Sequence, residues 1–204
     1  MLRKARNPFV WLVLYAISFA LSSQADIQYA GVNLAGAEFG TVSSYGGALP
    51  GTYNSQYIYP NSTEVNYYLG RGMNIIRLPF RWERLQHTNN AALDATELSR
   101  MQAFVSYATA HGMYVIIDPH NFQRYWPDIS TFDTMQSGSQ GVIGGTLVPD
   151  SAFSNFWYRV ADVFQTNDHV IFCLMNEPNA LPQTQLVASL NAASQESGRP
   201  APPT

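Results

Sequence analysis

Short, mainly apolar runs mark three stretches of the chain, at residues 73–79, 113–118 and 170–175. Each run is bounded by polar or turn-forming residues and lacks the strict alternation of a strand with one solvated face. Runs of this kind are typical of parallel strands that are buried on both sides. A weaker, glycine-containing run at residues 27–34 would add a strand before them. The pattern therefore predicts four parallel strands.

Apolar residues recur at helical spacing between these runs, at residues 62–71, 94–111 and 151–165. The second stretch begins with Asp94 and has Glu97 three positions later, which is the arrangement of a capping box. The first stretch begins in the same way. Strands and helices alternate, and each crossover is long enough for a right-handed parallel connection. The sequence therefore predicts an α/β fold.

Two architectures share this alternation: the doubly wound sheet and the (β/α)8 barrel. A nucleotide-binding doubly wound sheet would be expected to carry a G-x-G-x-x-G turn after its first strand, whereas residues 31–36 read GVNLAG. Long irregular segments follow predicted strands at residues 37–60 and 120–149. In barrels the loops after the strands build the active site. The sequence thus favours a (β/α)8 TIM barrel.

Polar side chains follow the predicted strands at the points where the strands end. Asn176 and Glu177 come directly after the last run, Arg77 lies near the end of the second strand, and His120 and Asn121 end the third. Taken singly, such residues are more often structural. At corresponding ends of successive barrel strands they would share one cleft. There an amide can bind a sugar 2-hydroxyl, and a carboxyl group can meet the glycosidic oxygen.

Four segments, in order, resemble the successive strand motifs of glycoside hydrolase family 5, particularly the fungal-type endoglucanases. They are GVNLAGAEFG at 31–40, GMNIIRLPFRWERLQ at 72–86, DPHNF at 118–122 and LMNEP at 174–178. The resemblance covers about residues 27–181, which is essentially all of the chain after the first 25 residues except its tail. It implies a retaining hydrolase that acts on β-glucan, an endo-β-1,4-glucanase or cellulase.

The resemblance also implies roles for the residues at the strand ends. Glu177 would be the general acid and base, Asn176 would bind the 2-hydroxyl, and Arg77, His120 and Asn121 would line the cleft. Retention of configuration needs a second carboxyl group ~5–5.5 Å from the first, which acts as the nucleophile. In the family that glutamate ends the seventh strand.

The sequence after Glu177 has no strand pattern that would supply this nucleophile. Glu196 is the only later acid, and it lies in a small, polar stretch. We therefore expect the chain to hold only the N-terminal half of the barrel, about the first four βα units, with the nucleophile absent. We expect this chain by itself to be inactive. The alternatives are a non-catalytic carbohydrate-binding remnant and a relative that acts on mannan or xyloglucan.

Aromatic residues in the loop after the third strand are candidates for stacking on a sugar ring, because the face of a pyranose is apolar. Trp126 is the main candidate and Tyr125 the second. Trp82 fits either a cleft or a packing position beneath a loop. Trp157 lies on the apolar stripe of a predicted helix, which indicates the core.

The first residues have the order of a secretory signal peptide. Basic residues within positions 3–6 precede an apolar stretch at 9–21, and small residues follow at Ser23 and Ala25. The stretch is shorter than the ~20 residues that span a bilayer. We therefore expect residues 1–25 to be removed and the protein to be secreted to the extracellular space, with no membrane contact afterwards.

The remaining sequence divides by composition into a hydrolase domain at residues 26–192 and a Ser/Gly/Pro-rich tail at 193–204. The whole chain carries a net charge of −3, which makes nucleic acid an unsuitable partner but does not oppose a neutral polysaccharide. Cys173 is the single cysteine, and the four histidines show no paired ligand spacing. We expect neither a metal nor a cofactor.

Overall fold

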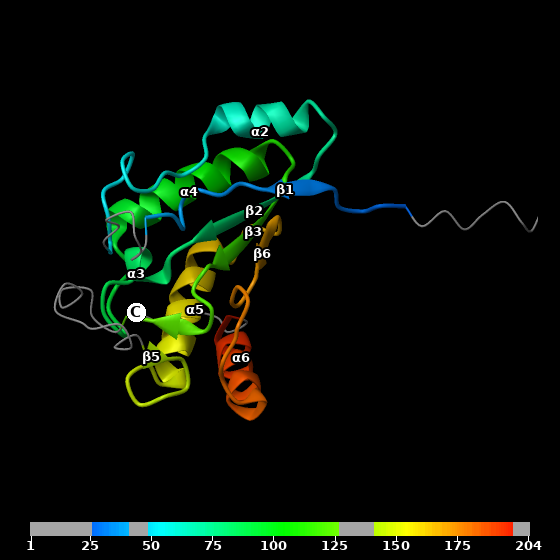
Figure 1. Cartoon of the computed structure of the whole chain (residues 1–204). Helices are drawn as coiled ribbons and strands as arrows, with labels where there is room; N and C mark the ends of the chain where they lie inside the picture. Colours follow the sequence, from blue (N-terminus) through cyan, green and yellow to red (C-terminus); the bar gives the residue numbers. More distant parts are fainter. Residues whose placement is uncertain (1–25, 41–48, 127–140, 198–204) are drawn as a thin grey trace, which may run out of the picture.

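The sheet of the protein is built from parallel strands that follow one another in the chain. The computed structural model describes residues 26–40, 49–126 and 141–197. Within them the sheet has the order β1 (Gly31–Asn33), β2 (Ile75–Phe80), β3 (Tyr114–Pro119) and β6 (Val170–Phe172), all parallel (Figure 1). The order never reverses, as it would in a doubly wound sheet, and it is the order of neighbouring barrel strands. All four strands were predicted.

Helices lie between these strands and after the last of them. They are α2 (Ser62–Leu69), α3 (Trp82–Leu85), α4 (Ala95–Ala110), α5 (Asp150–Phe164) and α6 (Gln183–Ser197). A short antiparallel pair, β4 (Arg124–Tyr125) and β5 (Gly141–Val142), follows β3. In Figure 1, α2 and α4 lie beside each other along one side, while α5 and α6 lie together at the other end.

The starts of α2 and α4 follow the capping signals in the sequence. The Asn61 side chain accepts from the Thr63 amide at 2.8 Å, and the Glu64 carboxylate accepts from the Asn61 amide at 2.6 Å. Asp94 caps α4 by accepting from the Glu97 amide at 2.8 Å. Each cap satisfies amide groups that the first turn of a helix leaves unpaired. The predicted helix starts are therefore confirmed.

The two faces of the sheet have different surroundings. Alternate residues of β2 and β3, including Ile76 and Ile117, are fully buried beneath the helices. On the opposite face, Ile75 and Ile116 are only partly buried. The close approach of β1 to β2 explains why Gly31 stands in the first strand. A Cβ at this position would lie 1.7 Å from the Ile75 carbonyl oxygen. The glycine thus allows β1 to approach β2.

The last helix extends beyond the change in composition. We assigned residues 193–204 to a tail, but α6 continues to Ser197. The proposed signal peptide, residues 1–25, and the last residues, 198–204, lie outside the described ranges. Among the described helices, none combines the length and the apolar character that crossing a membrane requires.

Candidate active site

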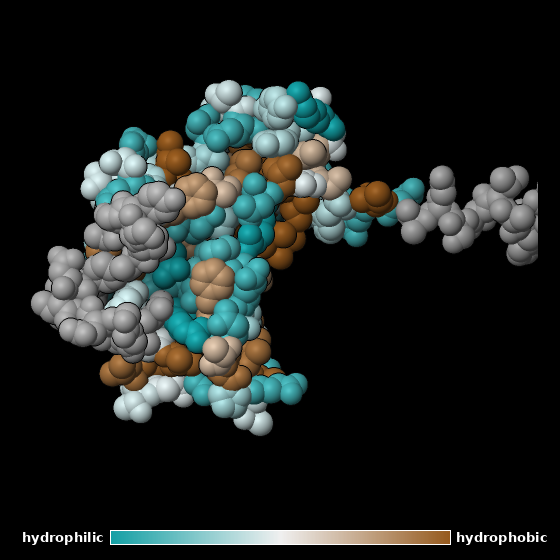
Figure 2. All heavy atoms as spheres, viewed as in Figure 1, coloured by the Kyte–Doolittle hydropathy of each residue, from teal (hydrophilic) through white to brown (hydrophobic). Residues whose placement is uncertain are grey.

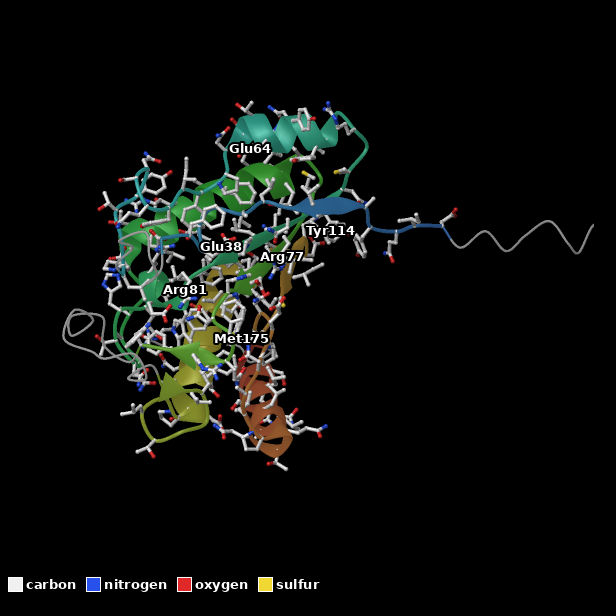
Figure 3. The ribbon with its side chains drawn as sticks, viewed as in Figure 1. Glu38, Glu64, Arg77, Arg81, Tyr114 and Met175 are labelled. Atoms are coloured by element: carbon white, nitrogen blue, oxygen red, sulfur yellow. The ribbon has the colours of Figure 1, made fainter. Side chains whose placement is uncertain are left out.

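Arg77 links β2 to the ends of the neighbouring strands, although it is the third of the six residues of β2 and does not lie near its end, where we expected it. Its side chain projects from β2 and is labelled in Figure 3. Its Nη2 donates to Asp118 Oδ2 at 2.5 Å and to Asn176 Oδ1 at 2.6 Å, and its Nη1 donates to Asn33 Oδ1. Asn33 ends β1, Asp118 lies in β3, and Asn176 follows β6. One guanidinium group therefore holds three neighbouring segments in register at one end of the sheet. We call Arg77, Asn33, Asp118, His120 and Asn176 the strand-end cluster.

His120 lies within the same cluster. Its Nδ1 is 3.5 Å from Arg77 Nη2 and 3.7 Å from Asp118 Oδ2, and its Nε2 is 3.4 Å from the Asn176 amide nitrogen. The structure therefore brings together Arg77, His120 and Asn176, which we expected to share a cleft. On the face shown in Figure 2, hydrophilic residues gather across the middle of the molecule, over β2 and β3.

Two members of the cluster were missed in the sequence. Asp118 was counted as the end of an apolar run and Asn33 as part of a weak first strand. The signal was present, since Asn33 is the last residue of β1 and Asp118 the last but one of β3. The Asp118 carboxylate is fully buried, whereas the Arg77 side chain is 29% exposed. Arg77 therefore compensates a buried negative charge and still reaches the surface.

The buried carboxylate also acts on Cys173. Burial, together with the nearby Asp118 carboxylate, raises the pKa of the Cys173 thiol to about 11. A thiol of this kind stays protonated near neutral pH and is a poor nucleophile. This setting suits a packing residue, although the Cys173 side chain is only partly buried.

Glu177 differs sharply from its neighbour Asn176. Asn176 is 8% exposed and bonded to Arg77, whereas Glu177 is exposed and has a left-handed backbone with φ of 38°. Within the described chain, the Glu177 carboxylate makes neither a hydrogen bond nor an ion pair. A non-glycine residue with positive φ is uncommon and is often found at functional sites. The chain thus turns directly after the cluster and leaves a free carboxylate beside it.

Asn121 does not belong to the open cluster, contrary to our expectation. It is 1% exposed, its Oδ1 accepts from the Trp82 amide at 3.0 Å, and its Nδ2 donates to Glu83 at 2.8 Å and to the Arg124 carbonyl at 3.0 Å. These bonds occupy both ends of the amide, so little capacity remains for a sugar hydroxyl. Asn121 instead supports the loop that follows β3.

Arg81 and Glu83 continue this supporting layer beneath His120. Arg81 Nη1 donates to the His120 carbonyl oxygen at 2.7 Å, and its Nε lies 3.4 Å from Glu83 Oε2. Glu83 is fully buried and also accepts from the Trp126 amide at 3.2 Å. The charged pair is therefore internal and fixes the backbone on both sides of Asn121.

The aromatic residues after β3 face inward. Tyr125 is fully buried, stacks on Trp82 with ring centroids 4.0 Å apart, and donates to the Gln86 carbonyl at 2.6 Å. It is a core residue and not a sugar platform. Trp126 is 8% exposed, which leaves little ring surface for a sugar, so its stacking role stays a prediction. Trp157 is fully buried, as its helical stripe predicted.

Across residues 26–40, 49–126 and 141–197, no three His, Cys, Asp or Glu side chains gather as ligands for a metal ion. The arrangement that remains is a buried acid, a bridging arginine, an oriented amide and a free carboxylate at the ends of parallel strands. This combination suits hydrogen bonding to a neutral polar substrate and proton transfer to it.

Known proteins are similar to this chain both in sequence and in fold. The cellulase family, glycosyl hydrolase family 5, matches residues 26–198. Endoglucanase gh5-1 of Neurospora crassa is 33% identical over 175 residues, covering 85% of this chain and 39% of that protein. The crystal structure of an endo-β-1,4-glucanase from Xanthomonas axonopodis pv. citri has a TM-score of 0.72 and 36% identity, covering 84% of this chain and 48% of that one.

A structure of XacCel5A in complex with cellopentaose has a TM-score of 0.70 and 35% identity, covering 83% of this chain and 49% of that one. The chain spans about half the length of these relatives, between 39% and 49%. These similarities and the sequential strand order confirm the predicted (β/α)8 architecture. The chain belongs to the cellulase family, glycosyl hydrolase family 5.

Proposed function

We propose that these 204 residues supply the acid/base part of the active site of a retaining endo-β-1,4-glucanase. The observation that carries the proposal is the pairing of Asn176 with Arg77 directly beside a free Glu177 carboxylate. The family match supports a glycosidic bond as the target, and the relative crystallised with cellopentaose supports a β-glucan chain as the substrate.

Glu177 would act twice in this mechanism. It first protonates the glycosidic oxygen as the bond to the anomeric carbon breaks, and then removes a proton from the water that releases the sugar. Its exposure and its lack of a partner in the described chain leave the carboxyl group available to substrate. Because the backbone turns at Glu177, the Glu177 side chain is exposed while that of Asn176 is buried.

Asn176 would orient the reacting sugar. Its Oδ1 is taken by Arg77 at 2.6 Å, so the amide cannot rotate freely and its Nδ2 remains the donor. A donor held in this way can bind the 2-oxygen of the sugar, a bond that strengthens in the transition state. Arg77 acts through Asn176 by fixing this amide, and His120 adds a polar ring beside it.

The second carboxyl group would come from residues beyond these 204. Among the described residues, Asp118 is the carboxylate of the strand-end cluster, and it is fully buried and paired with Arg77. It is therefore unsuited to attack an anomeric carbon. Because retention requires a nucleophile, we propose that the chain by itself does not hydrolyse β-glucan.

The test compares residues 26–204 with the same chain carrying Glu177→Gln, on carboxymethyl cellulose. Both should release reducing sugar at the background rate. Each of these two chains is then joined to the second half of the barrel of the Xanthomonas relative. In the completed pair, Glu177→Gln should lower the rate at least 10²-fold, which is the usual scale of general acid catalysis. Glu177-dependent hydrolysis by the short chain would refute the proposed absence of a nucleophile.

We also propose that the protein acts outside the cell after loss of residues 1–25. The basic, apolar and small-residue order of that segment supports this. Mass spectrometry of exported protein should give Asp26 as the first residue, and a mature N-terminus that retains residues 9–21 would contradict it.

A further inference from the structure

A concave surface lies between α4 and the segment that leads into α2, and none of its lining residues belongs to the strand-end cluster. It is a pocket of about 430 Å³. Its lining includes four aromatic rings, an arginine and an asparagine: Tyr53, Tyr59, Phe104, Tyr107, Arg100 and Asn61. Ligand sites commonly have volumes of ~300–1,000 Å³ and an apolar lining with a few polar groups. We call it the α2–α4 pocket.

The rings of the pocket are held in place by their neighbours. The Arg100 guanidinium lies over the Tyr53 ring at 4.1 Å, and Tyr57 packs edge-on against that ring at 5.7 Å. The Tyr107 hydroxyl donates to Asn66 at 3.1 Å. Tyr53 and Tyr107 remain partly exposed, whereas Tyr59 is almost fully buried. Rings fixed before binding lose little conformational freedom when a ligand arrives.

The pocket favours an uncharged ligand. The Arg100 charge is compensated by Glu97, which accepts from its Nη1 at 2.8 Å, and the same Nη1 donates to the Tyr57 hydroxyl at 2.9 Å. Burial, together with the nearby Glu97 carboxylate, raises the pKa of Tyr59 well above its usual value, so that the hydroxyl stays neutral. An anion would find no uncompensated cation among these lining groups.

The polar side chains at the rim suit hydroxyl groups. Ser62 and Ser99 line the pocket and are exposed, and each hydroxyl can donate and accept. Asn61 uses its Oδ1 to cap α2, which leaves its amide nitrogen as a donor. A ligand with an apolar face for the rings and hydroxyls around its edge would satisfy both features.

We propose that the α2–α4 pocket binds a pyranose unit of a neutral β-glucan chain, as a carbohydrate site separate from the strand-end cluster. The aromatic rings of the pocket, its lack of uncompensated charge and the serine hydroxyls at its rim all suit a pyranose. The choice of β-glucan rests on the proposed function. The site would hold the polymer on the helical side of the domain, while hydrolysis by the completed barrel would take place at the strand ends.

The test is retardation of residues 26–204 in native gels that contain soluble mixed-linkage β-glucan. Tyr107→Ala removes a ring from the pocket, and Ala103→Trp fills the pocket from an exposed position on α4. Both should weaken binding at least fivefold. Tyr67→Ala is the matched control, because Tyr67 is an exposed tyrosine on α2 outside the pocket lining, and it should bind as the parent does.

Ala103→Trp keeps the test decisive if Tyr107→Ala fails to fold, since it changes an exposed residue. Equal retardation of the parent and both pocket variants would overturn the proposal. Retardation by dextran but not by β-glucan would overturn the β-glucan assignment. The gel measures binding and not bond cleavage, so failure of the hydrolysis experiment above does not decide this one.

Discussion

The helix-covered face and the opposite face of the sheet present the same residue types in different surroundings. Ile76 and Ile117 are fully buried beneath helices, whereas their chain neighbours Ile75 and Ile116 are only partly buried. On this second face the apolar row ends at the charged side chain of Arg77. Stability should therefore come mainly from the covered face, and chemistry from the polar end of the open one.

The sharpest test of this difference is a matched pair in β3. Ile117→Ala should lower the free energy of unfolding by ~3–4 kcal/mol, because it leaves a cavity in a close-packed core. Ile116→Ala should cost less than ~1.5 kcal/mol, because that side chain remains partly solvated. Urea unfolding of both variants measures this. Equal losses would show that the two faces are equally packed.

A second test removes Arg77, the charged residue of the open face that pairs with Asp118. Arg77→Met should lower the free energy of unfolding by ~2–3 kcal/mol, because it leaves the buried Asp118 carboxylate without its cation. The double variant Arg77→Met with Asp118→Asn should recover much of that loss. A double-mutant cycle in urea checks this, and strictly additive losses would contradict the pairing.

A smaller effect is expected at the edge of the covered face, in the cap of α2. Asn61→Ala should cost ~1 kcal/mol, since the Thr63 amide loses its acceptor. Asn61→Asp keeps an acceptor at the same place and should be nearly neutral. Thermal unfolding of the two variants measures the difference, and an equal fall in both midpoints would exclude the cap as the cause.

An effect confined to high pH concerns Cys173, the residue directly after β6. Its thiol pKa is raised to about 11 from the ordinary 9.0, so the folded state holds its proton longer than the unfolded chain. The resulting stabilisation is complete below pH 9 and is lost as the pH rises towards 11. Alkylation of the native protein should accelerate across that range, and Asp118→Asn should move the acceleration to lower pH. A pH–rate profile like that of an unfolded thiol would contradict this environment.

The elements and the strand-end residues followed from the sequence because their signals are local. Apolar runs, capping residues and polar strand ends predicted the sheet, the helices α2, α4 and α5, and the meeting of Arg77, His120 and Asn176. The inward orientation of the Asn121 and Tyr125 side chains could not be predicted from the sequence. It depends on Trp82 and Glu83, which lie far away in the chain. Asp118 was overlooked because it closes an apolar run and its partner lies on another strand.

The central claim is that Glu177 is the acid and base of a retaining mechanism. Its most direct test uses the chain completed with the second half of the Xanthomonas barrel, bearing Glu177→Ala, and an aryl β-cellobioside with a good leaving group. That group departs without a proton, so a glycosyl intermediate should accumulate because water lacks a base. Azide needs no base, so it should accelerate turnover and give the β-cellobiosyl azide of retained configuration. Full activity of the variant on cellulose, or the absence of azide acceleration and azide product, would contradict the account.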